Sequence, residues 1–382
     1  MEIIGFILPF IVAVFLLLFF RKQTMWWEYL VLIVPSLLLF LLTRTIMVSV
    51  NESDTEYLGA YITKVRHYDE WDEWVKRTCS KRVPSGRDSN GNTTYRTVYY
   101  DCSYRRYHPE RWSYFDNNGE EHWLFYEEEF DAIRKRFNSP MVFVDMKRKY
   151  YRIDGDAQDY HWLGTKSTIR TVTYDRTYEN KIQSSRSIFN FEYINEKEAC
   201  ELGLYDYPKI EEYDQNPVLS DSISVSDKQI DAVKYINGYH GKNHQFRMYV
   251  LLFKDKDIEI SEQQRSYWVG GNKNELVVCL GMKDSTTVSW CNAFSWCDAP
   301  TLEVKTESYF AEKDSLDLIS YCDYIETLLI KDEWVRKEFA DFDYVRPEMS
   351  ITQYIWLIII VFLYNIGISL FIILNDFRNR ES

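Results

Sequence analysis

The sequence lacks the short motifs that mark common catalytic and cofactor sites. It contains no GxSxG nucleophile elbow, no HExxH zinc motif, no phosphate-binding P-loop and no dinucleotide-binding fingerprint. Its 58 acidic residues supply many carboxylates, but none can be paired as general acid and base without geometry. We therefore predict no catalytic residue and no bound cofactor.

Positive charge is also in short supply. The 382 residues include 45 Lys and Arg against 58 Asp and Glu, so the formal net charge is −13. A protein that binds nucleic acid needs clustered basic side chains that displace counterions from the phosphates. The composition therefore argues against nucleic acid as a partner.

Cysteine spacings typical of metal sites are missing. The seven cysteines form no CxxC pair and no zinc-type spacing with histidine, so no metal site is predicted. Cys79 and Cys102 flank a segment whose centre, Asn90-Gly91, is a hairpin turn signal. Such a hairpin brings the two cysteines together at its open end, where a disulfide is feasible in an oxidising compartment, and both the bonded and the free pair stay open.

One histidine pair has a metal-binding and a structural interpretation. His240 and His244 are four residues apart and would share a face if the segment were helical. Gly238 and Gly241 favour a loop instead. We therefore expect two solvent-exposed histidines in a loop and no metal ligands.

Aromatic residues are plentiful, at 17% of the chain, with 30 Tyr and 12 Trp. This composition suits a β-rich or interface-rich fold, because flat rings pack well on pleated surfaces. Trp71, Trp74, Trp112 and Trp123 could form an aromatic binding surface. Packing against a sheet is the simpler interpretation of these four residues.

Three long apolar runs dominate the two ends of the chain. Residues 3–20 contain no charge, and residues 29–43 and 351–374 form the second and third runs. With its flanks, each run is long enough to cross a hydrocarbon core of about 30 Å. We predict three transmembrane helices and the lipid bilayer as a partner. In the third helix, Asn365 and Gly367 suggest a helix–helix contact, although Asn365 could equally bond its own backbone.

Basic residues beside the apolar runs indicate an orientation. Arg21 and Lys22 separate the first two runs, and Arg378 and Arg380 follow the third. The positive-inside rule puts these short segments in the cytoplasm. We therefore predict a multi-pass protein of the cell (inner) membrane, with a large extracytoplasmic region and a cytoplasmic C-terminus.

The chain divides into four parts by composition. These are a transmembrane hairpin (1–48), a β-rich aromatic module (49–215), an αβ domain (216–346), and the third transmembrane helix with a short tail (347–382). Within the β-rich module, residues 127–137 have apolar residues at helical spacing, with acids leading and bases trailing. The fold class predicted is an integral membrane protein with a large extramembrane α+β region.

The αβ domain is predicted to alternate helices and strands, unlike the β-rich module before it. Ser226 and Gln229 form a capping-box pattern before an amphipathic helix. Buried strands are expected at 245–253 and 275–281, with a third strand beyond and helices at 314–330 and 332–340. This order predicts a compact αβ sandwich with one crossover connection.

A glycine pair precedes the second of these strands. In YWVGGNKNELVVCLG the glycines follow a predicted helix and lead into a strand, whereas a phosphate loop follows a strand and opens a helix. We therefore interpret Trp268, Gly270, Gly271 and Asn272 as a helix C-cap turn with left-handed backbone at the glycines.

Residues 218–340 resemble the TPM domain family of membrane-tethered domains from bacterial envelopes and thylakoid lumens. The resemblance is carried by VLSDSISVSDKQIDAVKYIN, then RMYVLLF, then the bend at Trp268–Asn272 that leads to ELVVCLGMKD. It implies an extracytoplasmic αβ domain used in assembly or modulation of membrane complexes. Phosphatase activity is proposed for some relatives, but no residue of this chain can be given that role.

Three functions fit these observations. The first is a membrane-anchored interaction, assembly or modulator protein that associates with itself or with another membrane or envelope protein through its aromatic outer region. The second is an oligomeric pore, with Asn365 on a shared axis. Polar residues form only a thin stripe on that helix, which weakens this second hypothesis. The third is an envelope hydrolase with its site in the cleft beyond the strand ends.

Overall fold

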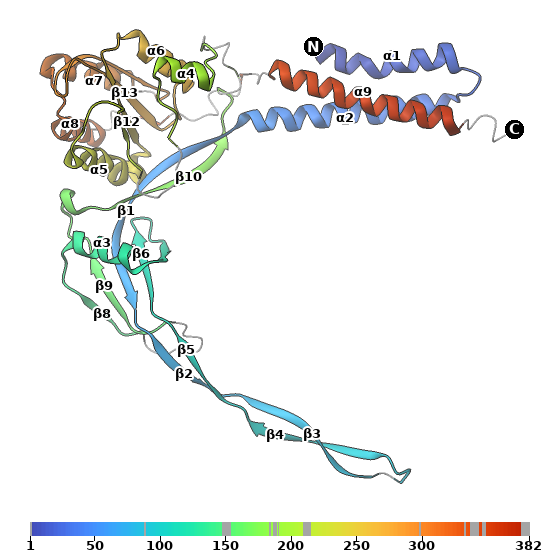
Figure 1. The fold of residues 1–382 in the computed structure, drawn as a ribbon, viewed down its shortest axis with the longest axis horizontal. Coiled ribbons are helices and arrows are strands. Elements are labelled where there is room, and N and C mark those ends of the chain that lie inside the picture. The colour runs from blue at the N-terminus through green and yellow to red at the C-terminus, as the bar shows by residue number, and fades with distance from the viewer. Residues whose placement is uncertain are drawn as a thin grey trace.

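The protein has three parts: a bundle of long helices, a curved β-rich part and an αβ unit (Figure 1). The computed structural model describes residues 2–87, 89–146, 154–182, 185, 189, 191–208, 215–297, 299–331, 334–336, 344, 345 and 349–375.

Among the residues that the structure describes, three helices are long and apolar enough to cross a membrane. They are α1 (Glu2–Phe20), α2 (Trp26–Glu52) and α9 (Ile351–Asn375), which confirms the three predicted apolar segments as helices. α1 and α2 form a hairpin, and α9 packs against both (Figure 1). Gly5 allows a close approach, because a Cβ atom there would lie 2.8 Å from the ring of Phe40.

The β-rich part is organised around one long strand. β1 (Ser53–Tyr68) begins directly after α2 and pairs in its first half with β10 (Thr171–Glu179). Its second half pairs with β6 (Arg111–Asp116) and β9 (Ala157–His161), and β7 (Glu121–Leu124) and β8 (Val142–Val144) complete the sheet. The predicted helix at 127–137 is confirmed as α3 (Glu127–Phe137). It buries Phe130, Ile133 and Phe137 against this sheet.

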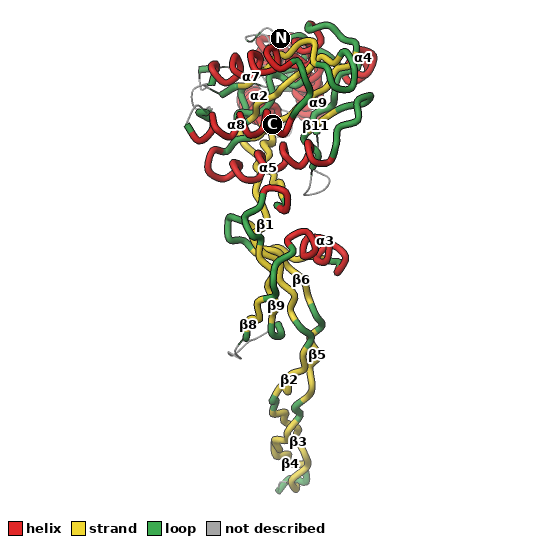
Figure 2. Tube along the Cα trace, turned by 90° about the vertical axis from the view of Figure 1, so that its left-hand side faces the viewer, coloured by secondary structure: helices red, strands yellow, loops and turns green. Residues whose placement is uncertain are grey.

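Beyond this sheet the chain extends as two successive two-stranded ribbons, which we call the arm (residues 71–108). β2 (Trp71–Val75) pairs with β5 (Tyr104–His108), and β3 (Thr78–Arg87) pairs with β4 (Thr93–Asp101), all antiparallel. The arm projects far from the αβ unit and bends back toward the side on which α1, α2 and α9 lie (Figures 1 and 2).

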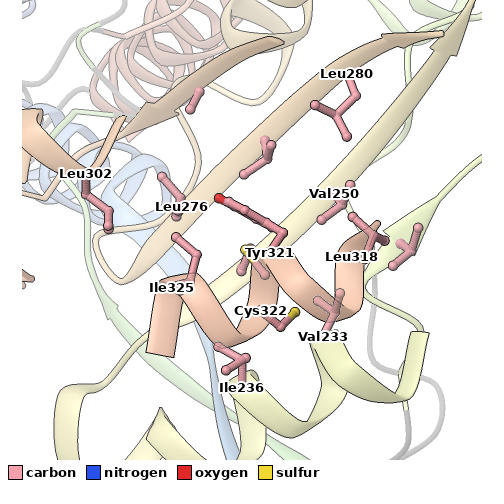
Figure 3. Close-up of a cluster of buried hydrophobic side chains, with 14 of the residues drawn as sticks. Val233, Ile236, Val250, Leu276, Leu280, Leu302, Leu318, Tyr321, Cys322 and Ile325 are labelled. Atoms are coloured by element: carbon pink, nitrogen blue, oxygen red, sulfur yellow. The ribbon is translucent and has the colours of Figure 1, made fainter. Parts of the chain in front are cut away.

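The αβ unit is a four-stranded sheet with helices on both faces. The strand order is β11-β12-β13-β14, with bounds Val218–Leu219, Arg247–Lys254, Glu275–Met282 and Val288–Ser295. α5 (Asp227–His244), α7 (Pro300–Lys313) and α8 (Leu318–Ile330) cover one face, and Figure 3 shows α8 side chains packed between α5 and the strands. α4 (Glu196–Leu202) and α6 (Glu259–Tyr267) cover the other face. A short 3-10 turn (Lys166–Thr168) precedes β10.

The connections of this sheet differ from the prediction in two ways. β11 and β12 are parallel, as are β12 and β13, so two crossovers are present where one was expected. β11 is only two residues long and gives no hydrophobic pattern. α7 was not predicted, and of the predicted helix at 332–340 the described residues 334–336 are not helical, the others lying outside the described residues. Residues 194, 199 and 204 pack on the sheet of the αβ unit, so its core also includes residues before 216.

Both ends of α5 differ from the prediction. Ser226 occupies the N-cap position, but its side chain accepts no capping hydrogen bond, and Gln229 Nε2 donates to the carbonyl of Leu316 instead. The helix does not end at Gly238 but continues to His244. The prediction of a loop at His240 and His244 was therefore wrong, and Gly238 and Gly241 have a packing role instead. A Cβ atom on Gly241 would lie 2.0 Å from the carbonyl oxygen of Gly59 in β1, so they permit helix and strand to touch.

Candidate functional site

The arm is the most unusual surface of the molecule. Among the described residues from 72 to 107, no side chain is buried, because a two-stranded ribbon has no second layer to cover either face. Tyr99 is 72% exposed and Trp74 is 63% exposed. Further aromatic side chains of the arm are exposed as well: Tyr95, Tyr100, Tyr104 and Tyr107. The prediction that Trp74 packs against a sheet was therefore wrong, since its ribbon has no covering layer.

A disulfide closes the distal hairpin at its base. Cys79 and Cys102 are bonded, with their Cα atoms 5.7 Å apart. The backbone N–H of Cys102 donates to the carbonyl of Arg77 at 2.9 Å, and the N–H of Arg77 donates to Ser103 Oγ at 3.0 Å. Gly91 supplies the positive φ (82°) of the turn at the tip. A two-stranded hairpin without a core is only marginally stable by itself, so the disulfide is a main constraint on this segment.

The arm carries charge of the opposite sign to the rest of the chain. Residues 71–108 contain eight Lys or Arg and four Asp or Glu, a net charge of +4, which leaves −17 on the remainder. Near the root the charges are paired, since Arg105 bonds Asp72 and Arg106 lies 3.4 Å from Glu73. Toward the tip, no described carboxylate lies within 4.0 Å of the nitrogens of Lys81, Arg82 or Arg96, so the uncompensated charge is distal. Lys81 and Arg82 lie in β3, and Arg96 lies in β4.

The root of the arm is firmly held. The ring of Trp71 stacks on that of His108, with ring centroids 4.7 Å apart. In the supporting sheet, Arg66 donates to both oxygens of Asp159 at 2.6 and 2.8 Å. Burial raises the pKa of Asp159, but the hydrogen bonds from Arg66 and Lys64 outweigh it and lower the pKa below its usual value. The arm therefore projects from a sheet fastened by ion pairs.

A polar network fastens β1 and β10 to the αβ unit, and the predicted C-cap turn is at its centre. Trp268 caps α6, Gly270 and Gly271 both have φ of 80°, and the next residue is Asn272. Asn272 Nδ2 donates to the carbonyl of Thr55 at 3.0 Å, while its Oδ1 accepts from Tyr178 at 2.6 Å. The turn thus joins the αβ unit to the first residues after α2.

Buried acids strengthen this junction. Glu275 is fully buried, and its Oε2 accepts from the backbone N–H of Asn272 at 2.8 Å. Burial raises the pKa of Glu275, and hydrogen bonds from Tyr207 and Asn272 oppose the increase only in part. Glu56, also fully buried, accepts from Arg336 Nη2 at 2.7 and 2.8 Å. Each of the two carboxylates is bonded to its own neighbours, and among the described residues of the junction none forms a free nucleophile–base pair.

Beside the junction lies a cleft of about 1130 Å³, formed by residues 193–197, the turn before β13 and the start of β1. Asp54, Glu196 and Asp206 give it an acidic lining, opposed by Lys197. Its aromatic residues include Tyr193, Tyr207, Tyr267 and Trp268. The cleft is at the amino ends of β12 and β13, whereas ligands of open α/β sheets usually bind at the carboxyl ends.

Within the helical bundle, Asn365 makes a contact between helices. Its Nδ2 donates to Ser36 Oγ of α2 at 2.7 Å and to the carbonyl of Val361 at 2.7 Å, so both interpretations of this residue apply. Gly367 makes no close approach, because a Cβ atom there would meet nothing within 4 Å. Of the two predicted contact residues, Asn365 therefore contacts another helix and Gly367 does not.

Two clusters of titratable side chains have structural explanations. His240 is 3% exposed, its Nδ1 lies 3.1 Å from Nδ1 of His244, and its Nε2 lies 3.4 Å from Glu326, so the expected exposed pair was wrong for His240. Asp116, Glu120 and His122 lie close enough to share an ion. Both oxygens of Asp116, however, already accept hydrogen bonds from neighbouring groups. This carboxylate closes a β-turn.

The arm was not predicted as a separate functional surface. The hairpin turn and the two cysteines were predicted, but packing against a sheet was the preferred interpretation of the tryptophans. The local sign of charge was the available signal, because six of the eight basic residues of the arm lie between positions 76 and 96 of an acidic chain.

Comparisons of the chain with known protein families, with curated proteins and with solved structures found no match. The resemblance of residues 218–340 to the TPM domain family therefore stays a prediction.

Proposed function

We propose that this chain is a membrane-anchored interaction protein whose arm binds another macromolecule outside the cytoplasm. The three apolar helices serve as the anchor, and the basic residues Arg21 and Lys22 in the short α1–α2 loop support a cytoplasmic side for that loop. The Cys79–Cys102 disulfide supports an oxidising compartment for the arm.

The observation that carries this proposal is the exposure of the arm. An isolated ribbon leaves the backbone groups of both edge strands unpaired along its length, which proteins normally avoid unless the edge is used for pairing. Exposed tyrosine, tryptophan and arginine are the residue types enriched at protein interfaces. A long element that buries nothing in the protein itself is explained if it buries its surface in a complex.

The other two functions receive less support. A pore needs polar side chains facing a shared axis, yet Asn365 is fully buried inside the bundle of one chain, bonded to Ser36. A hydrolase needs a nucleophile or activated water beside a base, yet the buried polar groups next to the cleft, Glu275, Tyr207 and Asn272, bond one another.

Photo-crosslinking in native membranes tests the proposal. A photo-reactive amino acid replaces Tyr99 on the arm, and the same group replaces Phe125 as the control, since Phe125 is 84% exposed but lies outside the arm. We expect adducts of discrete mass from the Tyr99 position and none from the Phe125 position. No adduct from the arm, or the same adducts from both positions, would contradict a binding role for the arm.

A further inference from the structure

We infer that the partner of the arm is the acidic cleft of a second copy of this chain. This inference rests on the proposed function and names the partner that the arm binds. Arm and cleft have complementary chemistry, and the geometry of one chain keeps them apart.

The cleft has the charge and the lining that the arm requires. Its lining contains three acidic residues, Asp54, Glu196 and Asp206, and one lysine, Lys197. Glu196 and Asp206 are exposed there, and Tyr193 is 76% exposed. Acidic groups beside aromatic rings suit arginine and lysine, because the ring faces attract cations in addition to the ion pairs. A volume of about 1130 Å³ exceeds the usual 300–1000 Å³ of small-molecule pockets, and thus fits a peptide segment.

The arm presents matching side chains on both faces of its distal hairpin. In the β3–β4 register, Arg82 opposes Thr97 and Val83 opposes Arg96, so Arg82 and Arg96 project from opposite faces. Tyr99 lies on the same face as Arg82. Tyr100 lies on the same face as Arg96, so whichever face enters a cleft offers a cation and a tyrosine.

The arm cannot reach the cleft of its own chain. It leaves the β-rich part on the side away from the αβ unit (Figures 1 and 2). The cleft lies beside the α2–β1 boundary, because Asp54 at the start of β1 lines it. Along the direction of the three long helices, the join between the two ribbons of the arm lies near the level of that same boundary, and β3 and β4 continue past it to the level of the long helices (Figure 1). A neighbouring copy anchored in the same membrane would therefore hold its cleft near the level at which the distal hairpin begins.

This contact is heterologous, because the arm of one copy meets a different surface of the next. Such contacts produce a ring if the rotation closes and an open chain if it does not. Membrane anchoring confines the copies to one plane, so the expected product is a ring or a row of copies in the membrane.

Charge reversal in the full-length chain tests the inference. The arm variant is Arg82→Glu with Arg96→Glu, and the cleft variant is Glu196→Lys with Asp206→Lys. Energy transfer between labelled copies in detergent micelles without charged lipid measures the Kd of self-association. The matched controls are Lys313→Glu and Glu312→Lys. Both residues are exposed on α7, which covers the face of the αβ sheet opposite to α4 and α6.

We expect both double variants to weaken self-association at least tenfold, while the α7 controls stay within twofold of the parent. Mixing the arm variant with the cleft variant should restore binding, because the reversed charges complement each other. Unchanged thermal unfolding midpoints of all variants show that folding is intact.

Other outcomes overturn the inference. If the arm variant loses binding while the cleft variant behaves like Glu312→Lys, the cleft is not the partner. If the parent does not self-associate but floats with vesicles containing anionic lipid, and the arm variant does not, the arm binds a lipid surface. In the first case adducts of discrete mass from the Tyr99 position would still be seen. Their absence, or adducts with lipid alone, would refute the proposed function itself.

Discussion

Substitution of Gly241 by alanine tests the contact that orients the β-rich part against the αβ unit. A Cβ atom at Gly241 would lie 2.0 Å from the carbonyl oxygen of Gly59 and 2.6 Å from its carbonyl carbon. Real Cβ atoms do not approach closer than 3.0 Å, so α5 and β1 must separate by about 1 Å. Backbone atoms on both sides form the contact, and no side chain can rotate to relieve it.

The expected cost follows from two opposing effects. Overpacking of this kind costs about 3 kcal/mol, and replacement of a helical glycine by alanine returns about 1 kcal/mol of helix propensity. The net loss in the free energy of unfolding is thus about 2 kcal/mol. For a unit of this size, each kcal/mol lowers the thermal midpoint by about 2–4 °C, so Gly241→Ala should lower it by about 4–8 °C.

Two further glycines of the chain provide graded controls. At Gly238 an added Cβ would meet the methyl group of Thr171 at 2.5 Å and the carbonyl oxygen of Ala60 at 2.8 Å, both farther than the carbonyl oxygen at 2.0 Å from position 241, so its cost should be smaller. At Gly367 it would meet nothing within 4 Å, so Gly367→Ala should not destabilise the protein. Tryptophan fluorescence during heating of the full chain in detergent measures the midpoints. Equal midpoints for the alanine variants at 241 and 367 would refute the reasoning.

Three other features lead to measurable expectations. Replacing Asn365 by leucine should cost about 1 kcal/mol of bundle stability, and a double-mutant cycle with Ser36→Ala should be non-additive, because both changes remove the same bond. Reduction of the Cys79–Cys102 bond, which spans 23 positions, should remove about 3 kcal/mol from the arm and speed its cleavage by trypsin more than tenfold, while the αβ unit stays resistant. Burial holds the pKa of His240 below its usual 6.5, so the unfolded chain takes up a proton that the folded chain excludes. The free energy of unfolding should therefore be full above pH 6.5 and fall below it. Thermal midpoints measured between pH 7 and 5 should decrease less in His240→Asn than in the parent.

Features that depend on neighbouring residues were predictable from the sequence. The three apolar helices, α3 and the Asn90-Gly91 turn all follow from runs of fewer than 30 residues, since chain length, charge placement and turn chemistry act locally. α7 was missed because PTLEVKTESYFAEK lacks a clear apolar stripe, although Pro300 at its first turn is a helix-start signal.

Features that depend on distant partners were not predictable. Gly238 and Gly241 reduce helix propensity, and only the approach of Gly59, far earlier in the chain, explains why α5 continues through them. Likewise, TTYRTVYY has the β-branched and aromatic composition of a strand, yet none of its side chains is buried. The sequence pattern specifies pairing between β3 and β4 but cannot reveal that both faces of the pair are exposed.

One strand connects the anchor to the arm. The chain leaves α2 at Glu52, runs through β1 to Tyr68 and enters the arm at Trp71. Along that path the αβ unit holds β1 at consecutive points: Asn272 bonds the carbonyl of Thr55, and Asn274 Nδ2 donates to the carbonyl of Tyr57 at 2.9 Å. A binding element held in place loses less conformational freedom on association than a free one. The αβ unit can therefore support recognition without touching the partner of its own arm, because it sets the direction in which the arm projects from the membrane helices.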